Sequence, residues 1–492
     1  MNKIKKVLIA NRGEIACRII RTLKRLDIAA VVVYHSLDAD SPAVAMAGEA
    51  LKIDGPTPVA AYLDIDGMVA ACKATGADAV HPGFGFLAEN AEFAKRLGQA
   101  GVTFIGPSPG NIELMGNKIR ARSFCMENKF PLSPSVTEDD RGESFVQQAR
   151  ELGVPLLIKA AAGGGGKGMQ IVRAPDDLEA AVQIAKTEAL RAFGSDRIYA
   201  ERYEETPRHI EVQIMADHYG QVLHLGEREC SLQRRFQKII EESPAPGLER
   251  DLRERMCALA VEIARRSEYR NAGTVEFLLS PDGNFYFLEM NTRIQVEHPV
   301  TEMVTGIDLV EMQIRIAQGE PLALRQDDIE TTGHAIELRI CAEDPQNDFM
   351  PTTGGLLSYS LPQGDGVRID HGLAQGMAIT PAFDSMLAKM IAHGQNREEA
   401  IQRIKKAINA TWILGVTTNA DYLARLVAHP DYAAGRIHTG FIPRHHGDLQ
   451  PPDLSVDQRN LLLAAAALGS DEIANPEFEV KEPYANIGMW RN

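Results

Sequence analysis

The chain has 492 residues, a formal net charge of −15 at pH 7, 45% hydrophobic residues and 24% charged residues. These values are typical of a globular protein with several domains, and the negative charge argues against nucleic acid or an anionic membrane as the main partner. The six cysteines have no CxxC or CxxH spacing, and no apolar run approaches the roughly 18 residues of a membrane span. We therefore expect a cytoplasmic protein without a zinc site, a disulfide framework or a membrane segment.

The first segment alternates strand and helix patterns. Short apolar runs typical of buried parallel strands occur at residues 6–10, 29–34, 79–80 and 103–105. Between the first two runs, Ile15, Ile19 and Leu23 recur at helical spacing. This alternation predicts an open parallel sheet. A dinucleotide-binding domain is a weaker alternative, because the turn at residues 11–14 lacks three spaced glycines.

A glycine run at residues 163–166 lies between two predicted strands, residues 155–159 and 170–173. No Gly-Lys-Ser or Gly-Lys-Thr is present, and a strand rather than a helix follows, so neither a Walker loop nor a dinucleotide loop fits. A hairpin with a glycine tip instead predicts a mobile flap whose N–H groups close over phosphates. Lys159, just before the run, and Lys118 suit the same phosphates, although an isolated glycine run is more often a linker.

Polar and apolar residues alternate from residue 209 to residue 214, which predicts a half-buried strand. His209, Glu211 and Gln213 then share one face of that strand. Residues 228–238 concentrate cationic side chains, which on a surface would form a solvated basic patch. A histidine on a strand is more often structural than functional, so neither segment indicates a site by its pattern alone.

Residues 274–290 predict a β-hairpin with Asp282-Gly283 as its loop. In that register Glu276 faces Glu289, and Asn291 follows two residues later on the same face. Opposed like charges destabilise a sheet unless something separates them, and Mg²⁺ or Mn²⁺ takes oxygen ligands of this kind. The alternative is that each glutamate pairs with a lysine or arginine elsewhere.

Arg293, Gln295 and Glu297 alternate after the hairpin, and Pro299 favours an extended backbone before it. If the segment is extended, the three side chains point one way. A guanidinium suits a planar anion such as a carboxylate or bicarbonate, and Glu297 could then take its proton. A solvated Arg–Glu pair is the alternative.

Further along, residues 301–319 and 397–414 predict helices, residues 333–345 open a segment of short strands, and residues 461–468 predict an Ala-rich helix.

Residues 289–302, EMNTRIQVEHPVTE, resemble the signature of biotin carboxylases, the ATP-grasp enzymes that carboxylate biotin. IANRGEIA at 9–16, HPGFGFLAEN at 81–90, QRRFQK at 233–238 and GHAIELRICAEDP at 333–345 are similar to further motifs of that family. The resemblance implies an α/β and α+β protein: an N-terminal open parallel-sheet (Rossmann-like) domain at 1–115, an ATP-grasp domain at 116–320 with a mobile glycine-rich lid at about 135–203, and a mixed β-rich C-terminal domain at 333–445. Residues 446–492 would be an appended tail.

The resemblance also assigns site residues. It implies ATP binding by Lys118, Lys159, Gly165, Gly166, Glu201, Tyr203, His209, Gln233, Phe236, Lys238, Glu276 and Glu289, with Glu201 contacting the adenine amino group. One or two Mg²⁺ or Mn²⁺ ions would bind Glu276, Glu289 and Asn291. Bicarbonate would lie at Lys238, Arg293, Gln295 and the backbone of Val296, and biotin at Phe84 and Arg339. The implied catalytic residues are Glu297 as base, with Arg293, Lys238 and Arg339.

The implied reaction forms carboxyphosphate from bicarbonate and ATP and then carboxylates biotin. Ala388-Lys389-Met390 lacks the first methionine of a Met-Lys-Met biotin attachment site. Biotin is therefore expected on a separate biotin carboxyl carrier protein, with a carboxyltransferase subunit as second partner and a homodimer as the assembly. Two alternatives stay open: another ATP-grasp ligase that joins a carboxylate to an amine, and a non-catalytic nucleotide-binding subunit.

Four places depart from the commonest family pattern. Phe84 and Phe236 stand where tyrosine and histidine are usual, Ala161-Ala162 replace Ser-Gly, and Glu204 replaces an apolar residue. These departures bear on nucleotide affinity and flap kinetics, since the implied metal ligands, base and cations are all present.

Overall fold

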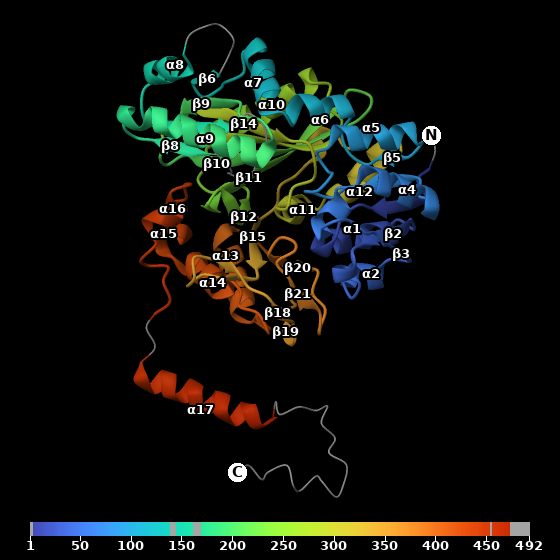
Figure 1. The fold of residues 1–492 in the computed structure, drawn as a ribbon, viewed down its shortest axis with the longest axis vertical. Coiled ribbons are helices and arrows are strands. Elements are labelled where there is room, and N and C mark those ends of the chain that lie inside the picture. The colour runs from blue at the N-terminus through green and yellow to red at the C-terminus, as the bar shows by residue number, and fades with distance from the viewer. Residues whose placement is uncertain (1–2, 138–143, 161–168, 453–454, 473–492) are drawn as a thin grey trace, which may run out of the picture. The chain divides into compact units, whose positions relative to one another are not determined.

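The computed structural model describes residues 3–137, 144–160, 169–452 and 455–472 (Figure 1). The chain divides into two compact units, residues 1–449 and 450–492. The second unit contains α17 (Val456–Glu472), which includes the predicted Ala-rich segment. No helix in the described part of the chain is long and apolar enough to cross a membrane.

The N-terminal part is a five-stranded parallel sheet in the order β3-β2-β1-β4-β5. Its strands are β1 (Lys6–Ile9), β2 (Ala29–Tyr34), β3 (Glu49–Lys52), β4 (Ala79–His81) and β5 (Thr103–Phe104). Its helices are α1 (Gly13–Arg25), α2 (Pro42–Met46), α3 (Pro58–Tyr62), α4 (Ile65–Thr75), α5 (Ala91–Gln99) and α6 (Pro109–Met115), with a 3₁₀ turn at Ser36–Asp38. These parallel pairings confirm the predicted parallel sheet. The helical spacing of Ile15, Ile19 and Leu23 places these residues of α1 in the core.

A smaller antiparallel sheet carries the segment around the glycine run, in the order β6-β9-β7-β8. It consists of β6 (Ser135–Thr137), β7 (Leu156–Ala160), β8 (Gln170–Val172) and β9 (Ile198–Arg202). Apolar residues of α8 (Phe145–Leu152) and α9 (Leu178–Phe193) form one core cluster with this sheet. Helix α7 (Lys118–Glu127) precedes it, and a 3₁₀ turn occupies Pro175–Asp177. The two strands predicted on either side of the glycine run therefore pair.

An eight-stranded antiparallel sheet holds the rest of the first unit together, in the order β14-β13-β10-β11-β12-β15-β22-β20. Its strands are β10 (Arg208–Ala216), β11 (Val222–Arg234), β12 (Gln237–Ser243), β13 (Asn271–Leu279), β14 (Phe285–Asn291), β15 (His334–Cys341), β20 (Val367–His371) and β22 (Met386–Gly394). The pairing of β12 with β15 makes the predicted ATP-grasp and C-terminal segments one continuous sheet.

Helices and short strands complete this unit. The helices are α10 (Arg250–Arg266), α11 (His298–Thr305), α12 (Leu309–Ala317), α13 (Arg397–Asn409), α14 (Ala420–Ala428), α15 (Pro430–Ala433) and α16 (Phe441–Arg444), with a 3₁₀ turn at Gln326–Asp328. The short strands are β16 (Glu343–Asp344), β17 (Met350–Pro351), β18 (Gly354–Gly355), β19 (Ser358–Ser360), β21 (Ala378–Ile379) and β23 (Trp412–Leu414).

The two faces of β15 and β22 differ in character. Ile336 and Leu338 of β15, with Met390 of β22, share a core cluster with residues of α13 and α14. The alternate residues Glu337, Arg339 and Lys389 lie on the other face of the sheet. Helix α1 packs against β20 and β22. One side of this sheet is therefore ordinary core and the other carries buried charge.

Two predicted helices end earlier than expected. The helix predicted at 301–319 is two helices, α11 and α12, because Gly306 ends the first with φ +72° and the Asp308 side chain caps the second by accepting from Glu311 N–H. The helix predicted at 397–414 ends at Asn409, and residues 412–414 instead form β23, which pairs with β19. Apolar spacing alone does not reveal either break.

Candidate functional site

The predicted hairpin exists, with a different loop. Ser280 N–H donates to the Asn284 carbonyl, so three residues rather than two form the turn, and Gly283 adopts φ +84°. A β-bulge between Glu276 and Phe277 then restores the register. Glu276 faces Glu289 as predicted, and Asn291 faces Thr274. The expected juxtaposition of carboxylates is correct, although the two local details that produce it are not those predicted.

Lys238 is the centre of the site. From β12 its Nζ donates to the carboxylates of Glu211 at 2.5 Å, Glu276 at 2.8 Å and Glu297 at 2.7 Å. Burial alone would lower the pKa of this ammonium, but the three carboxylates raise it well above its usual value. Lys238 is therefore a permanently charged cation held among anions.

Glu297 lies between two cations. Its second oxygen accepts from Arg339 Nη2 at 2.9 Å, and its side chain is completely buried. Burial alone would raise the pKa of this carboxyl, but the charges of Lys238, Arg339 and Arg228 hold it well below its usual range. Arg339 also binds Glu241, whose pKa burial raises to about 7. Glu297 is consequently an ionised carboxylate whose basicity depends on how closely its cations approach.

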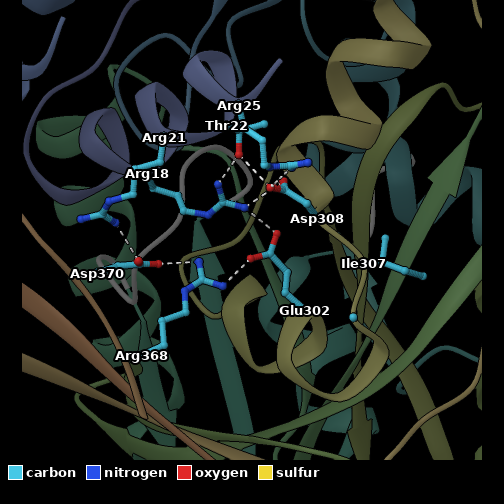
Figure 2. A pocket seen from close by; sticks show the side chains of 10 residues that line it. Arg18, Arg21, Thr22, Arg25, Glu302, Ile307, Asp308, Arg368 and Asp370 are labelled. Carbon is cyan, nitrogen blue, oxygen red and sulfur yellow. Dashed lines mark hydrogen bonds and ion pairs between the residues drawn. The ribbon is translucent and has the colours of Figure 1, made fainter. Parts of the chain in front are cut away.

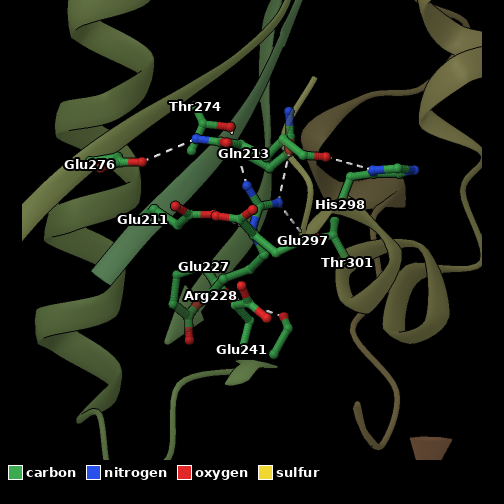
Figure 3. A network of polar contacts seen from close by, with 12 residues as sticks. Glu211, Gln213, Glu227, Arg228, Glu241, Thr274, Glu276, Glu297, His298 and Thr301 are labelled. Atoms are coloured by element: carbon green, nitrogen blue, oxygen red, sulfur yellow. Dashed lines mark hydrogen bonds and ion pairs between the residues drawn. The ribbon is translucent and has the colours of Figure 1, made fainter. Parts of the chain in front are cut away.

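Arg228 is completely buried, and its guanidinium lies within the network of polar contacts in Figure 3. It pairs with Glu211 at 2.5 Å and donates to Gln213 at 2.8 Å and to Thr301 at 3.0 Å. Glu211 and Gln213 share a face of β10, as their alternation predicted. The Nε2 atom of His209, also on β10, lies 2.9 Å from the second oxygen of Glu276, and its Nδ1 accepts from Gln233 Nε2 at 2.7 Å. The structure thus brings His209, Gln233 and Glu276 together.

The segment after the hairpin is not extended, contrary to the prediction. Arg293 donates to Gln295 Oε1 at 2.7 Å and to Asn291 Oδ1 at 2.9 Å, so these groups do converge. Glu297, however, lies in a turn with φ −80° and ψ 8°, and α11 begins at the next residue. Pro299 occupies the first turn of α11, where its missing N–H costs nothing, and this overrides its preference for an extended preceding residue. Glu297 therefore points to Lys238 and Arg339 instead of alongside Arg293.

The carboxylates at the predicted metal site also have protein partners. Glu276 accepts from Asn291 at 2.8 Å and Gln295 at 3.0 Å, in addition to Lys238 and His209. Glu289 pairs with Lys118 at 3.0 Å. The alternative interpretation, that each glutamate pairs with a cation, thus describes part of this arrangement. Glu276 and Glu289 nevertheless face each other on opposed strands, with Asn291 bonded to Glu276, and a donor set of carboxylate and amide oxygens fits Mg²⁺ or Mn²⁺.

The residues predicted to bind the nucleotide have different surroundings in the structure. Lys159 and Arg122 both pair with the Glu201 carboxylate, which is 2% exposed. That carboxylate is therefore engaged by two cations rather than directed at an open pocket. Phe236, in contrast, is 47% exposed, and the Arg173 guanidinium lies 5.8 Å from the centre of the Tyr203 ring. Gly165, Gly166 and the Ala161-Ala162 departure lie outside the described residues.

The two residues assigned to biotin lie on different elements. Arg339 projects from β15 onto Glu297 and Glu241. Phe84 follows β4, packs against the core cluster that contains Ile294, and accepts at its carbonyl from Asn11 Nδ2 at 2.7 Å. The Phe84 position is thus fixed by the N-terminal core.

Three buried charged residues near the site were not predicted as functional: Glu241, Glu337 and Lys389. Glu89, whose carboxylate accepts from Arg293 Nε at 3.0 Å, was also not predicted. The sequences around these residues carry the signal, because Glu337, Arg339 and Lys389 interrupt apolar runs that are typical of buried strands. Reading that signal requires knowing that β12, β15 and β22 are neighbours.

Three family models match the chain. They describe the N-terminal domain of biotin carboxylase (residues 3–112), the ATP binding domain of the carbamoyl-phosphate synthase L chain (residues 117–325) and the C-terminal domain of biotin carboxylase (residues 337–444). Together these models cover most of the described residues of the first unit.

Named relatives are of two lengths. The chain is 48% identical over 443 residues to a biotin carboxylase of Halalkalibacterium halodurans, covering 90% of this chain and 98% of that protein. It is 45% identical over 468 residues to subunit alpha of a mitochondrial methylcrotonoyl-CoA carboxylase of Mus musculus. That match covers 94% of this chain but 65% of the mouse protein, so the chain spans less than two thirds of that relative.

Solved structures match at the level of the whole fold. The biotin carboxylase domain dimer of Hydrogenobacter thermophilus 2-oxoglutarate carboxylase, in complex with MgADP, ADP and bicarbonate, is 43% identical, with a TM-score of 0.89 over 92% of this chain and 100% of that chain. A Campylobacter jejuni biotin carboxylase in complex with a β,γ-ATP ligand is 40% identical, with a TM-score of 0.87 over 90% of this chain and 99% of that chain.

Proposed function

Because the chain belongs to the biotin carboxylase family, we propose that it carboxylates biotin with ATP and bicarbonate, with the site residues in the roles derived below. The observation that carries these roles is the position of Glu297, which binds Lys238 through one oxygen and Arg339 through the other. A base held between a phosphate-binding cation and a biotin-binding cation is suited to a reaction that uses both substrates in sequence.

The first step activates bicarbonate. Arg293 and Gln295 hold the anion, and Glu297 takes its proton as an oxygen of bicarbonate attacks the γ-phosphorus of ATP, which forms carboxyphosphate and releases ADP. Lys238 neutralises charge that develops on the transferred phosphoryl group. As Lys238 turns towards the phosphoryl oxygens, Glu297 loses one of the two cations that contact it. The pKa of Glu297 then rises during the step in which it accepts the proton.

The second step transfers CO₂. Carboxyphosphate breaks down to CO₂ and phosphate, the phosphate takes the N1′ proton of biotin, and the resulting enolate attacks CO₂. Arg339 stabilises the negative charge of the enolate oxygen. Closure of the glycine-rich lid would exclude water, which otherwise hydrolyses carboxyphosphate.

Glu276, Glu289 and Asn291 would hold the divalent cation. When bound, Mg²⁺ or Mn²⁺ supplies positive charge that neutralises the nucleotide phosphates. Lys118 pairs with Glu289 and Lys238 pairs with Glu276, so the same two lysines lie beside the metal ligands and would share the phosphates with the ion.

We also propose partners, an assembly and a location for this chain. Lys389 is completely buried in β22, which supports biotin arriving on a separate carrier protein, with a carboxyltransferase subunit as the next partner. We also propose a homodimer, since the Hydrogenobacter thermophilus domain is described as a dimer, and a cytoplasmic location, since all six cysteines are free. Sedimentation of the purified chain at several concentrations tests the dimer.

The deciding experiment measures ADP release by the purified protein with Mg-ATP and free biotin, with and without bicarbonate. A rate that requires both biotin and bicarbonate supports biotin carboxylation. A rate that depends on a different acid, or tight ATP binding without turnover, would contradict the proposal and favour another ATP-grasp ligase or a non-catalytic subunit.

A further inference from the structure

Lys389 is a buried lysine that contacts the turn that carries the proposed base, Glu297. It lies on β22, its side chain is 0% exposed, and its Nζ donates to the carbonyl oxygen of Val296 at 2.7 Å. Val296 immediately precedes the base, Glu297. An ammonium that is fully buried and bonded to a backbone carbonyl requires a compensating anion nearby.

That anion comes from the N-terminal part of the chain. Glu14, near the start of α1, lies with Oε1 3.3 Å from Lys389 Nζ. Its carboxyl is buried, and neither oxygen has a hydrogen-bond partner among the described residues. Burial raises the pKa of Glu14 to about 7, and the charge of Lys389 is the largest effect that opposes this rise. Lys389 therefore links α1 electrostatically to the turn that carries the base.

The sheet surrounds Lys389 with further charge. On its two neighbouring strands, Asp370 of β20 and Arg339 of β15 lie directly opposite it. Glu337, two residues before Arg339, is also fully buried, and burial raises its pKa well above the usual value while Lys389 opposes the rise. The same face of the sheet thus carries both the cation that binds Glu297 directly and the cation that binds the peptide in front of it.

We propose that Lys389 is a positioning residue for bicarbonate activation: with Glu14 as its counter-ion, it fixes the Val296–Glu297 peptide so that Glu297 faces Lys238 and Arg339. Because a peptide unit is planar, holding the Val296 carbonyl also fixes the direction in which the chain enters Glu297. A turn has no ladder of sheet hydrogen bonds to hold it, so one strong donor from a rigid strand has a large effect there. This inference rests on the proposed function.

A purely architectural role for Lys389 would be to attach α1 to the sheet. Other contacts already do this (Figure 2). Arg18 of α1 pairs with Glu302 of α11 at 2.8 Å, Arg21 pairs with Asp370 at 2.9 Å, and Arg368 pairs with Glu302 at 2.7 Å. These pairs line a cavity of about 380 Å³ and involve neither Lys389 nor Glu14. The bond to the Val296 carbonyl is the feature of Lys389 that this attachment does not explain.

The experiment uses the double variant Glu14→Gln/Lys389→Met beside the single variant Lys389→Met. The single variant leaves buried carboxyls without their cation, so it is expected to lose stability and is not decisive alone. The double variant removes the charge of both partners and is expected to fold while still lacking the donor to Val296. Lys6→Met is the matched control, because Lys6, at the start of β1, also donates to a carbonyl, Thr75 at 2.8 Å, and pairs with a carboxylate, Glu49 at 2.9 Å.

Two readouts separate positioning from general damage. In the double variant we expect kcat/KM for bicarbonate to fall about 100-fold, the effect of a displacement of about 1 Å, with KM for ATP within about twofold of wild type. Hydrogen exchange of backbone amides in residues 292–298 should become faster, while the β1–β4 strands keep their protection. Lys6→Met should change neither quantity.

The results are read independently of one another. Unchanged exchange at residues 292–298 in a folded double variant would overturn the positioning role, whatever the activity. Equal losses for ATP and bicarbonate would overturn it too, because they indicate a structural role. If the wild type itself shows no bicarbonate-dependent ADP release, the proposed function fails, whereas the exchange measurement still decides whether Lys389 holds the turn.

Discussion

Lys238 Nζ lies 2.7 Å from Glu297 Oε1, so the proposed base is ion-paired with the proposed phosphoryl-stabilising cation. For Glu297→Gln we expect bicarbonate-dependent ADP formation to fall by about 10²–10⁴-fold, because the amide cannot accept the proton. Binding of ATP should be retained, since Lys238 keeps its pairs with Glu211 and Glu276. Steady-state ADP release and a separate ATP-binding titration measure the two effects.

Glu241→Gln is the control for that substitution. Glu241 binds the same arginine, Arg339, but burial raises its pKa to about 7, so much of it is already uncharged near neutral pH. An amide there should change ADP formation by only a few-fold. Equal losses in the two variants would show that the charge balance around Arg339 matters and that Glu297 is not the base.

Local patterns in the sequence predict much of this site. The apolar runs, the helical spacing in α1 and the alternation in β10 all correspond to observed elements, and Glu276 does face Glu289. These features depend on neighbours within a few residues or on one short hairpin. The signature motif at 289–302 then points to Glu297 and Arg293, and the QRRFQK motif points to Lys238, which the fold places in contact with Glu297.

The remaining features depend on contacts between distant segments. The pairing of β12 with β15 joins Ile240 to Leu338, and Lys389 reaches Val296 across a sequence separation of 93 residues. Sequence patterning cannot supply such pairings. The turn at Glu297 was mispredicted for a related reason: the bias before a proline was outweighed by the suitability of Pro299 for the first turn of a helix.

Arg228 and Glu211 form a fully buried ion pair, and this predicts an asymmetric effect on stability. Arg228→Met should lower the free energy of unfolding by about 3–5 kcal/mol, because it leaves Glu211 buried with less compensating charge. Adding Glu211→Met should recover a large part of that loss, since the pair is then replaced by apolar groups. Urea denaturation of the two variants and of wild type measures this. A double variant as unstable as Arg228→Met would contradict the expectation.

The proposed metal ligands differ in how strongly the protein itself holds them. Glu289 pairs with Lys118 alone among the described contacts, whereas Glu276 accepts from four side chains. Glu289→Gln should therefore raise the Mg²⁺ or Mn²⁺ concentration for half-maximal ADP release by about 10–100-fold, with little loss of stability.

Mn²⁺ titrations in the presence of ATP, followed by electron paramagnetic resonance, test the metal affinity directly. Glu113→Gln is the control, because Glu113 is an exposed glutamate of α6 that pairs with Arg120 at 3.6 Å. An unchanged Mn²⁺ affinity in Glu289→Gln would remove Glu289 from the proposed ligand set.

His81, at the end of β4, should make stability depend on pH. It is completely buried, Gly83 N–H donates to its Nδ1 at 3.1 Å, and its Nε2 lies 3.2 Å from Gln313 Oε1. Burial lowers the pKa of His81 from 6.5 to about 4, so between these values the unfolded chain binds a proton that the folded chain does not. Its contribution to stability is therefore complete above pH 6.5 and is lost as the pH falls towards 4, by about 2 kcal/mol between pH 7 and pH 5.

In His81→Gln this part of the loss should disappear, and the free energies of unfolding of wild type and variant, measured in urea at both pH values, should converge by that amount at pH 5. A difference between the two proteins that is the same at pH 7 and pH 5 would show that His81 is not kept neutral by the fold.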